Sequence, residues 1–151
     1  MKKFRFQFET VERVRKTRED ESLRSLGQAQ ALYNETLKQK EKLLGTLAGA
    51  LERREALGSG NQAATVLEFQ LESDFIAGTK VRINQQDQAI LRARRMVEKA
   101  LRTYLAARRQ TRMMEMLREK AFGEYKIARN KHLQKQSDDL SIMRNRLRET
   151  A

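Results

Sequence analysis

Two long heptad-patterned segments flank one cluster of turn residues, Gly58-Ser59-Gly60-Asn61, and this arrangement constrains the fold more than any other feature of the chain. Glycine reaches positive φ without a Cβ clash, and serine and asparagine hydrogen-bond to nearby backbone, so the cluster predicts that one helix stops and another starts. The 151 residues include no proline, so nothing forbids helices far longer than average. We therefore expect a first helix over about 5–57, a turn at 58–61 and a second helix over about 62–148, with Gly78 as the weakest point, where a break is possible.

The first segment repeats apolar residues every seven positions. One row contains Leu26, Tyr33, Lys40 and Leu47, and the other contains Leu23, Gln30, Leu37, Leu44 and Leu51. Rows spaced by sevens and offset by three or four lie on one face of a helix, which predicts a coiled-coil seam. Before Leu23, polar residues such as Arg15, Arg18 and Ser22 stand where apolar ones are expected, so the seam is predicted to be interrupted or shifted there.

The second segment has a longer and more regular pattern. One row contains Phe69, Ile76, Ile83, Ile90, Val97, Tyr104 and Thr111, and the other contains Ala93, Ala100, Ala107, Met114, Ala121 and Ala128. Large side chains beside alanines let a partner helix approach closely, which suits antiparallel packing within one chain. Apolar residues make up only 39% of the chain, which fits a thin seam better than a thick core. The sequence therefore predicts an all-α fold, an elongated antiparallel two-helix coiled-coil hairpin that forms one domain over 1–151.

The two predicted helices differ in length. An unbroken second helix would leave about 35 residues, from about Met116 onward, without a partner inside the chain. Either that helix breaks near Gly78, or its end, which carries the row Leu133, Leu140 and Leu147, is covered by another protein.

Positive charge is concentrated in two blocks of a chain whose net charge is +12. Residues 1–18 hold seven Lys or Arg against two Glu, and residues 92–135 hold fourteen against four. An antiparallel hairpin brings both blocks to the end remote from the turn, which predicts an acidic partner there. The alternative is an ordinary solvated face of a charge-rich coiled coil.

Signals for chemistry or membrane insertion are weak. The only histidine is His132, and there is no cysteine, so a metal site or nucleophilic triad has nothing to be built from. We expect no enzymatic activity, no cofactor and no catalytic or metal-binding residue. No apolar run approaches the roughly 18 residues that span a bilayer, and the basic N-terminus lacks the apolar core of a signal peptide. We expect a cytoplasmic protein that touches the membrane only through partners.

Both ends of the chain resemble one known family. Residues 4–15, FRFQFETVERVR, resemble the opening of the flagellar FliJ family, in which an F-x-F-x-x-E start leads into V/L-x-x-x-R and then an acidic segment, here Glu19-Asp20-Glu21. Residues 134–144, QKQSDDLSIMR, resemble that family's closing Q-K-x-x-D-E-x-A-x-x-R pattern, with Asp139 in place of Glu and Ser141 in place of Ala. The length, the near-central turn and the two basic arms agree, so the resemblance covers essentially the whole chain.

The resemblance implies a component of the flagellar type III export apparatus. Members of the family are antiparallel coiled coils similar to the stalk subunit of rotary ATP synthases. They bind the hexameric export ATPase by inserting a coiled-coil end into its centre, and they contact the cytoplasmic domain of the export gate FlhA; export chaperones are further candidate partners. They lack catalytic activity. The gate-contacting surface lies near the turn, here roughly at 40–51 and 75–86.

These implied partners suggest two sets of site residues. The candidates for ATPase binding are the arginines of the basic end, Arg13, Arg15, Arg18, Arg108, Arg109 and Arg112. The candidates for gate binding are Phe75, Leu44, Leu51 and Thr79. Phe75 is the best single anchor, because it precedes the seam residue Ile76 by one position and so projects about 100° away from the seam.

Three other interpretations remain open from the residues alone. The chain could be an injectisome stalk homologue, a generic coiled-coil scaffold or a basic nucleic-acid-binding coiled coil, since a basic segment before heptads is also found in basic-zipper proteins. Against nucleic acid, residues 1–18 interleave their basic side chains with Phe and Glu, and the charge lies in two arms. No nucleic-acid partner is therefore expected.

Overall fold

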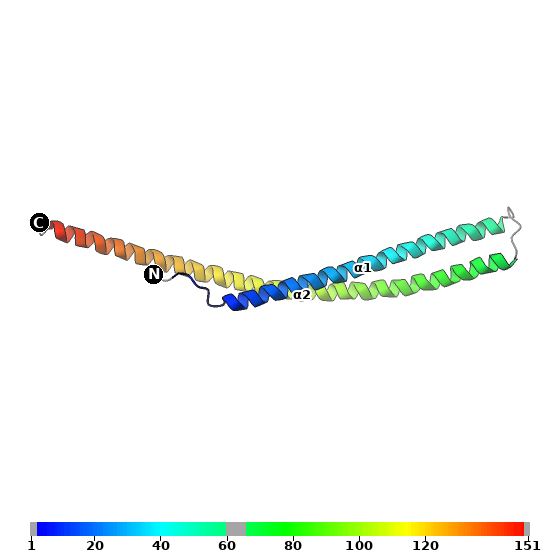
Figure 1. Cartoon of the computed structure of the whole chain (residues 1–151), viewed down its shortest axis with the longest axis horizontal. Coiled ribbons are helices and arrows are strands. Elements are labelled where there is room, and N and C mark those ends of the chain that lie inside the picture. The colour runs from blue at the N-terminus through cyan, green and yellow to red at the C-terminus, as the bar shows by residue number, and fades with distance from the viewer. Residues whose placement is uncertain (1–2, 60–65, 150–151) are drawn as a thin grey trace. The chain divides into compact units, whose positions relative to one another are not determined.

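The computed structural model describes residues 3–59 and 66–149, which form two α-helices and no strand. Helix α1 spans Glu9–Gly58 and helix α2 spans Val66–Glu149, and Figure 1 shows them side by side. The predicted all-α two-helix hairpin is confirmed. Within the described residues, neither helix contains an apolar stretch long enough to cross a bilayer.

Each helix runs through two compact units. The central unit is Glu21–Leu105, and the terminal unit consists of Met1–Asp20 together with Ala106–Ala151. In the central unit, ion pairs join Lys40 to Asp87 and Arg53 to Glu72. In the terminal unit, ion pairs join Glu12 to Arg118 and Glu19 to Arg108. The residue number in α2 falls as that in α1 rises, so the helices are antiparallel in both units.

Helix α1 begins at Glu9, later than the predicted start near residue 5. Glu9 and Glu12 lie in its first turn, where carboxylates favour the positive end of the helix dipole. The residues before it are non-helical because their aromatic side chains pack against α2 instead. The rings of Phe4 and Phe122 have centroids 5.1 Å apart in an edge-on arrangement, and Phe6 is buried.

The predicted turn is described only in part. Gly58 is the last residue of α1, and the backbone N–H of Ser59 donates to the Glu55 carbonyl over 3.0 Å. Gly60 and Asn61 lie outside the described residues, as does the predicted helix start at 62.

Helix α2 continues through Gly78 without the break that was possible there. Gly78 faces open space, so its missing side chain leaves no gap in the seam. Its neighbours Ile76 and Thr79 are buried, and the Thr79 hydroxyl donates to the Phe75 carbonyl over 2.8 Å. Packing on either side of Gly78 thus offsets the helix weakening of about 1 kcal/mol that a glycine brings.

The seam of the central unit confirms three of the four predicted rows, apart from one end residue. On α1, the row of Leu26, Tyr33, Lys40 and Leu47 is half-buried. On α2, both rows are buried or half-buried here, except that Phe69 is exposed. The predicted row of Leu23, Leu37, Leu44 and Leu51 is wrong, because these leucines are exposed. The second row of α1 is instead Ala29, Thr36, Leu43 and Ala50, whose small members let α2 approach closely.

Polar groups maintain the α1 seam at positions where an interruption was predicted. Ser22 is buried, and Arg15 is half-buried with its guanidinium donating to the Gln110 carbonyl over 3.2 Å. Glu12 and Glu19 are also buried, although both are charged. Thr111 of α2 is also buried, and its hydroxyl lies 3.4 Å from the Arg15 carbonyl and 3.3 Å from the Ala107 carbonyl of its own helix. The helix face therefore keeps its phase, and only its chemistry changes.

The last part of α2 is exposed. Every side chain in 126–146 is exposed, including Ala128, Leu133 and Leu140. Ala128 was predicted as a seam residue, and that prediction is wrong. The side chain of Leu147 lies outside the described residues.

Candidate functional site

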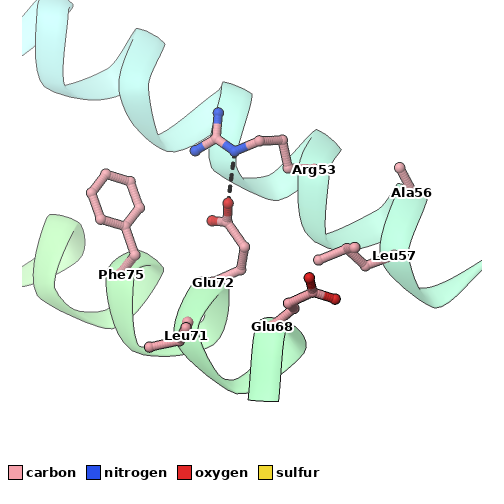
Figure 2. Close-up of a pocket in the computed structure, with 7 residues that line it drawn as sticks. All are labelled: Arg53, Ala56, Leu57, Glu68, Leu71, Glu72 and Phe75. Carbon is pink, nitrogen blue, oxygen red and sulfur yellow. Dashed lines mark hydrogen bonds and ion pairs between the residues drawn. The ribbon is translucent and has the colours of Figure 1, made fainter. Parts of the chain in front are cut away.

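A groove between the two helices of the central unit contains the best gate-binding candidate. Its lining residues are Arg53, Ala56 and Leu57 of α1 and Glu68, Leu71, Glu72 and Phe75 of α2 (Figure 2). We call it the Phe75 groove, and its volume is about 650 Å³. The lining residues of each helix are spaced by three or four positions or are adjacent, so they share one helix face.

Phe75 supplies the exposed aromatic surface of this groove. It is 41% exposed, as expected for a residue about 100° from the seam position Ile76. Leu71, one turn earlier in α2, is also exposed. Exposed apolar side chains gathered at a hollow are typical of a protein-binding surface, whereas scattered ones are not.

An ion pair crosses the groove. The Arg53 Nε donates to Glu72 Oε1 over 2.7 Å, as the dashed line in Figure 2 shows. The other oxygen, Glu72 Oε2, is buried and has no hydrogen-bond partner among the residues that the structure describes. A carboxylate oxygen withdrawn from water without a donor is unfavourable, so this atom would gain from a donor brought by a ligand.

The structure does not gather the other three gate candidates around Phe75. Leu51 lines a separate hollow with Phe69, and Leu44 lines another with Leu37. Thr79 is 2% exposed, and its hydroxyl is bonded within its own helix. Thr79 therefore offers no side-chain contact to a partner while the helices stay packed.

The six arginines proposed for ATPase binding all lie in the terminal unit, but they differ in their surroundings. Arg15 is half-buried, and the other five are exposed. Three of the six have partners within the chain. Arg15 donates to the Gln110 carbonyl, Arg108 pairs with Glu19 at 2.8 Å, and Arg112 pairs with Glu115 at 3.1 Å.

The Glu19–Arg108 pair shows the electrostatics of this unit. The hydrogen bond from Arg108 holds the pKa of the Glu19 carboxyl below its usual value; burial opposes this effect, and Thr111 and Lys16 add to it. Glu12 is buried beside Arg118, whose Nη1 lies 3.3 Å from both carboxylate oxygens. Both acidic side chains thus point into the seam, which leaves the outward charge of the unit predominantly basic.

Sequence reasoning missed two features. The Arg53–Glu72 pair was missed because the contact depends on the register of the hairpin. The aromatic cluster of Phe4, Phe122 and Tyr125 was missed because the N-terminal residues were assigned to the helix. The alternating Phe4, Phe6 and Phe8 is a period-two pattern, and that period could have indicated an extended segment.

Comparison with known proteins gives one match. The family model described as Flagellar FliJ protein matches residues 4–150, nearly the whole chain. No curated protein matches, and neither does any solved structure.

Proposed function

The chain belongs to the flagellar FliJ family and is therefore a component of the flagellar export apparatus, in which we propose that it forms the central stalk of the export ATPase hexamer and links it to the export gate FlhA. The family is a non-catalytic export component, and we infer that this chain also acts by binding alone. Its place would be the cytoplasm, at the inner face of the membrane through these partners, with export chaperones as further candidates.

The terminal unit supports the ATPase contact. Arg13, Arg18 and Arg109 are exposed, whereas Glu12 and Glu19 are turned into the seam. Long basic side chains on several sides of a narrow helix pair can engage an acidic or polar pore and accelerate association with it. The exposed residues 126–146 add an apolar and basic surface that the described chain does not cover.

The exposed Phe75 carries the gate contact. It stands beside Leu71 in a groove that both helices build, close along the chain to the turn. Aromatic side chains that fill a partner's pocket commonly supply much of the binding energy at an interface. The seam itself does not require this side chain, because Ile76 and Thr79 fill the core there.

Three sets of variants, one of them a control, test both contacts in one experiment. Arg13→Glu with Arg18→Glu should weaken binding to the ATPase hexamer by about tenfold or more at low salt, and less at high salt. Lys38→Glu with Lys42→Glu, at exposed lysines of the central unit, is the matched control and should change that affinity less than about twofold. Phe75→Ala should weaken binding to the gate's cytoplasmic domain by about tenfold or more and leave the ATPase affinity unchanged.

The pattern of losses decides the proposal. Equal weakening by the arginine and lysine pairs would show that net charge, not the basic end, controls ATPase binding. A large loss of thermal stability in Phe75→Ala without a selective loss of gate binding would assign Phe75 to the core.

A further inference from the structure

We propose that the Phe75 groove takes an arginine side chain from the partner, held by Glu72 and by the face of Phe75. The inference deepens the gate contact and rests on the proposed function only for the partner's identity. It requires three properties of the groove: a carboxylate oxygen without a donor, an apolar and aromatic lining, and an acidic setting.

The carboxylate oxygen is the first observation. Glu72 uses Oε1 to accept from Arg53, and its Oε2 is buried without a donor among the described residues. Figure 2 shows this side chain reaching from α2 toward Arg53, with Phe75 to one side. A guanidinium has five N–H donors, so it can supply the missing hydrogen bond once the Glu72 side chain turns Oε2 toward the open groove, while other donors remain in water.

The lining fits the rest of an arginine side chain. Phe75 presents an exposed ring, and Leu57 and Leu71 provide aliphatic surface in the same groove. Arginine buries its methylene stem against such surface and stacks its planar head on aromatic rings. A lysine ammonium offers neither the planar head nor the fork of donors, so arginine is the better fit.

The surrounding charge favours a basic partner. Residues 52–75 contain five carboxylates against two arginines, in a chain whose net charge is +12. The acidic residues are Glu52, Glu55, Glu68, Glu72 and Asp74. This stretch therefore attracts a basic segment, whereas the two basic blocks of the chain repel one.

The probe is the acetylated and amidated tripeptide Leu-Arg-Leu, titrated into the full chain while the NMR signals of Leu57, Leu71 and Phe75 are followed. Its control is the same tripeptide with citrulline, which keeps the shape of arginine and removes the charge. The arginine probe should shift the groove signals and bind at least about fivefold more tightly than the citrulline probe. Glu72→Gln should lower the affinity for arginine to that for citrulline and leave the citrulline affinity unchanged.

A matched variant separates the specific contact from general charge. Asp74→Asn removes the same charge from an exposed residue two positions away, outside the groove lining, and should leave the preference for arginine intact. Phe75→Leu keeps an apolar side chain and should reduce arginine binding by a few fold through loss of the ring face. Helicity by circular dichroism checks that each variant folds.

Several results would overturn the inference. These are equal affinity for the two tripeptides, equal loss in Asp74→Asn and Glu72→Gln, or shifts outside the groove. Groove signals that change with protein concentration in the absence of peptide would assign the groove to a second copy of the chain. Binding of the gate domain with no arginine preference in the groove would reject this inference alone. Arginine binding without binding of the gate domain would reject the proposed gate contact alone.

Discussion

Removing Arg108 is expected to destabilise the terminal unit more than removing Glu19, although both substitutions break the same ion pair. The Arg108 side chain is 55% exposed, and the Glu19 side chain is 11% exposed. After Glu19→Gln, the arginine head returns to water, and the amide can still accept a hydrogen bond. After Arg108→Met, a buried carboxylate loses its main donor, and the weaker effects of Thr111 and Lys16 do not replace it.

The expected magnitudes follow from this difference in exposure. Loss of a charge-assisted hydrogen bond to a buried carboxylate costs about 2–3 kcal/mol, which Arg108→Met should approach. Glu19→Gln should cost about 0.5–1 kcal/mol, close to an ordinary hydrogen bond. The double variant Glu19→Leu with Arg108→Met should recover most of the larger loss, because it leaves no buried charge without a partner.

Native-state hydrogen exchange is the suitable assay, since it reports the terminal unit without assuming that the whole chain unfolds in one step. Amides of residues 9–20 and 106–120 should lose protection by about 30- to 100-fold in Arg108→Met and by about three- to fivefold in Glu19→Gln. Arg109→Met, at the neighbouring exposed position, is the control and should change little. Equal losses in the two single variants, or a larger loss in Glu19→Gln, would refute the reasoning.

Two further predictions concern pH and the seam. The lowered pKa of Glu19 means that its carboxylate stabilises the fold above its ordinary value of 4.5 and that this contribution disappears as the pH falls through the lower folded-state pKa. In urea titrations, the difference in unfolding free energy between the native chain and Glu19→Gln should therefore be constant from pH 7 to about 5 and shrink at more acidic pH. A difference that grows on acidification would contradict this prediction. In the central unit, Ala50→Leu should cost about 1–3 kcal/mol because Ala50 is fully buried, whereas Leu51→Ala should cost about 1 kcal/mol or less because Leu51 is 38% exposed. If urea unfolding showed a larger loss of stability in Leu51→Ala than in Ala50→Leu, Leu51 would belong to the seam, as the sequence predicted.

The helices and most of the seam could be predicted because they depend on local sequence. The absence of proline and the seven-residue rows suffice for two long helices, and the α2 row from Ile76 onward follows directly from its spacing. The second row of α1 could not be predicted in this way, because a row that lies three positions after the first row and one that lies four positions after it are both compatible with a heptad. At Leu43-Leu44 and Ala50-Leu51, either neighbour fits, and only the close approach of α2 selects Leu43 and Ala50.

The terminal unit was harder to predict because charged residues occupy its seam. The hydrophobic pattern does not identify Glu12 and Glu19 as core residues, since isolated carboxylates avoid burial. Their burial depends on Arg118 and Arg108, which lie about ninety or more positions away in the chain. Such pairs can be recognised only once the register of the two helices is known.

The same dependence on register explains which parts of the candidate site were foreseen. Phe75 could be placed outside the seam from its position beside Ile76 alone, and its exposure confirms that placement. The ion pair of Arg53 with Glu72 could not, because it joins two arms whose alignment the sequence leaves open. Leu44 and Leu51 were predicted both as seam residues and as gate candidates, two roles that exclude one another. Their exposure removes the first role, so any contact that they make must be with a partner approaching α1 at hollows separate from the Phe75 groove.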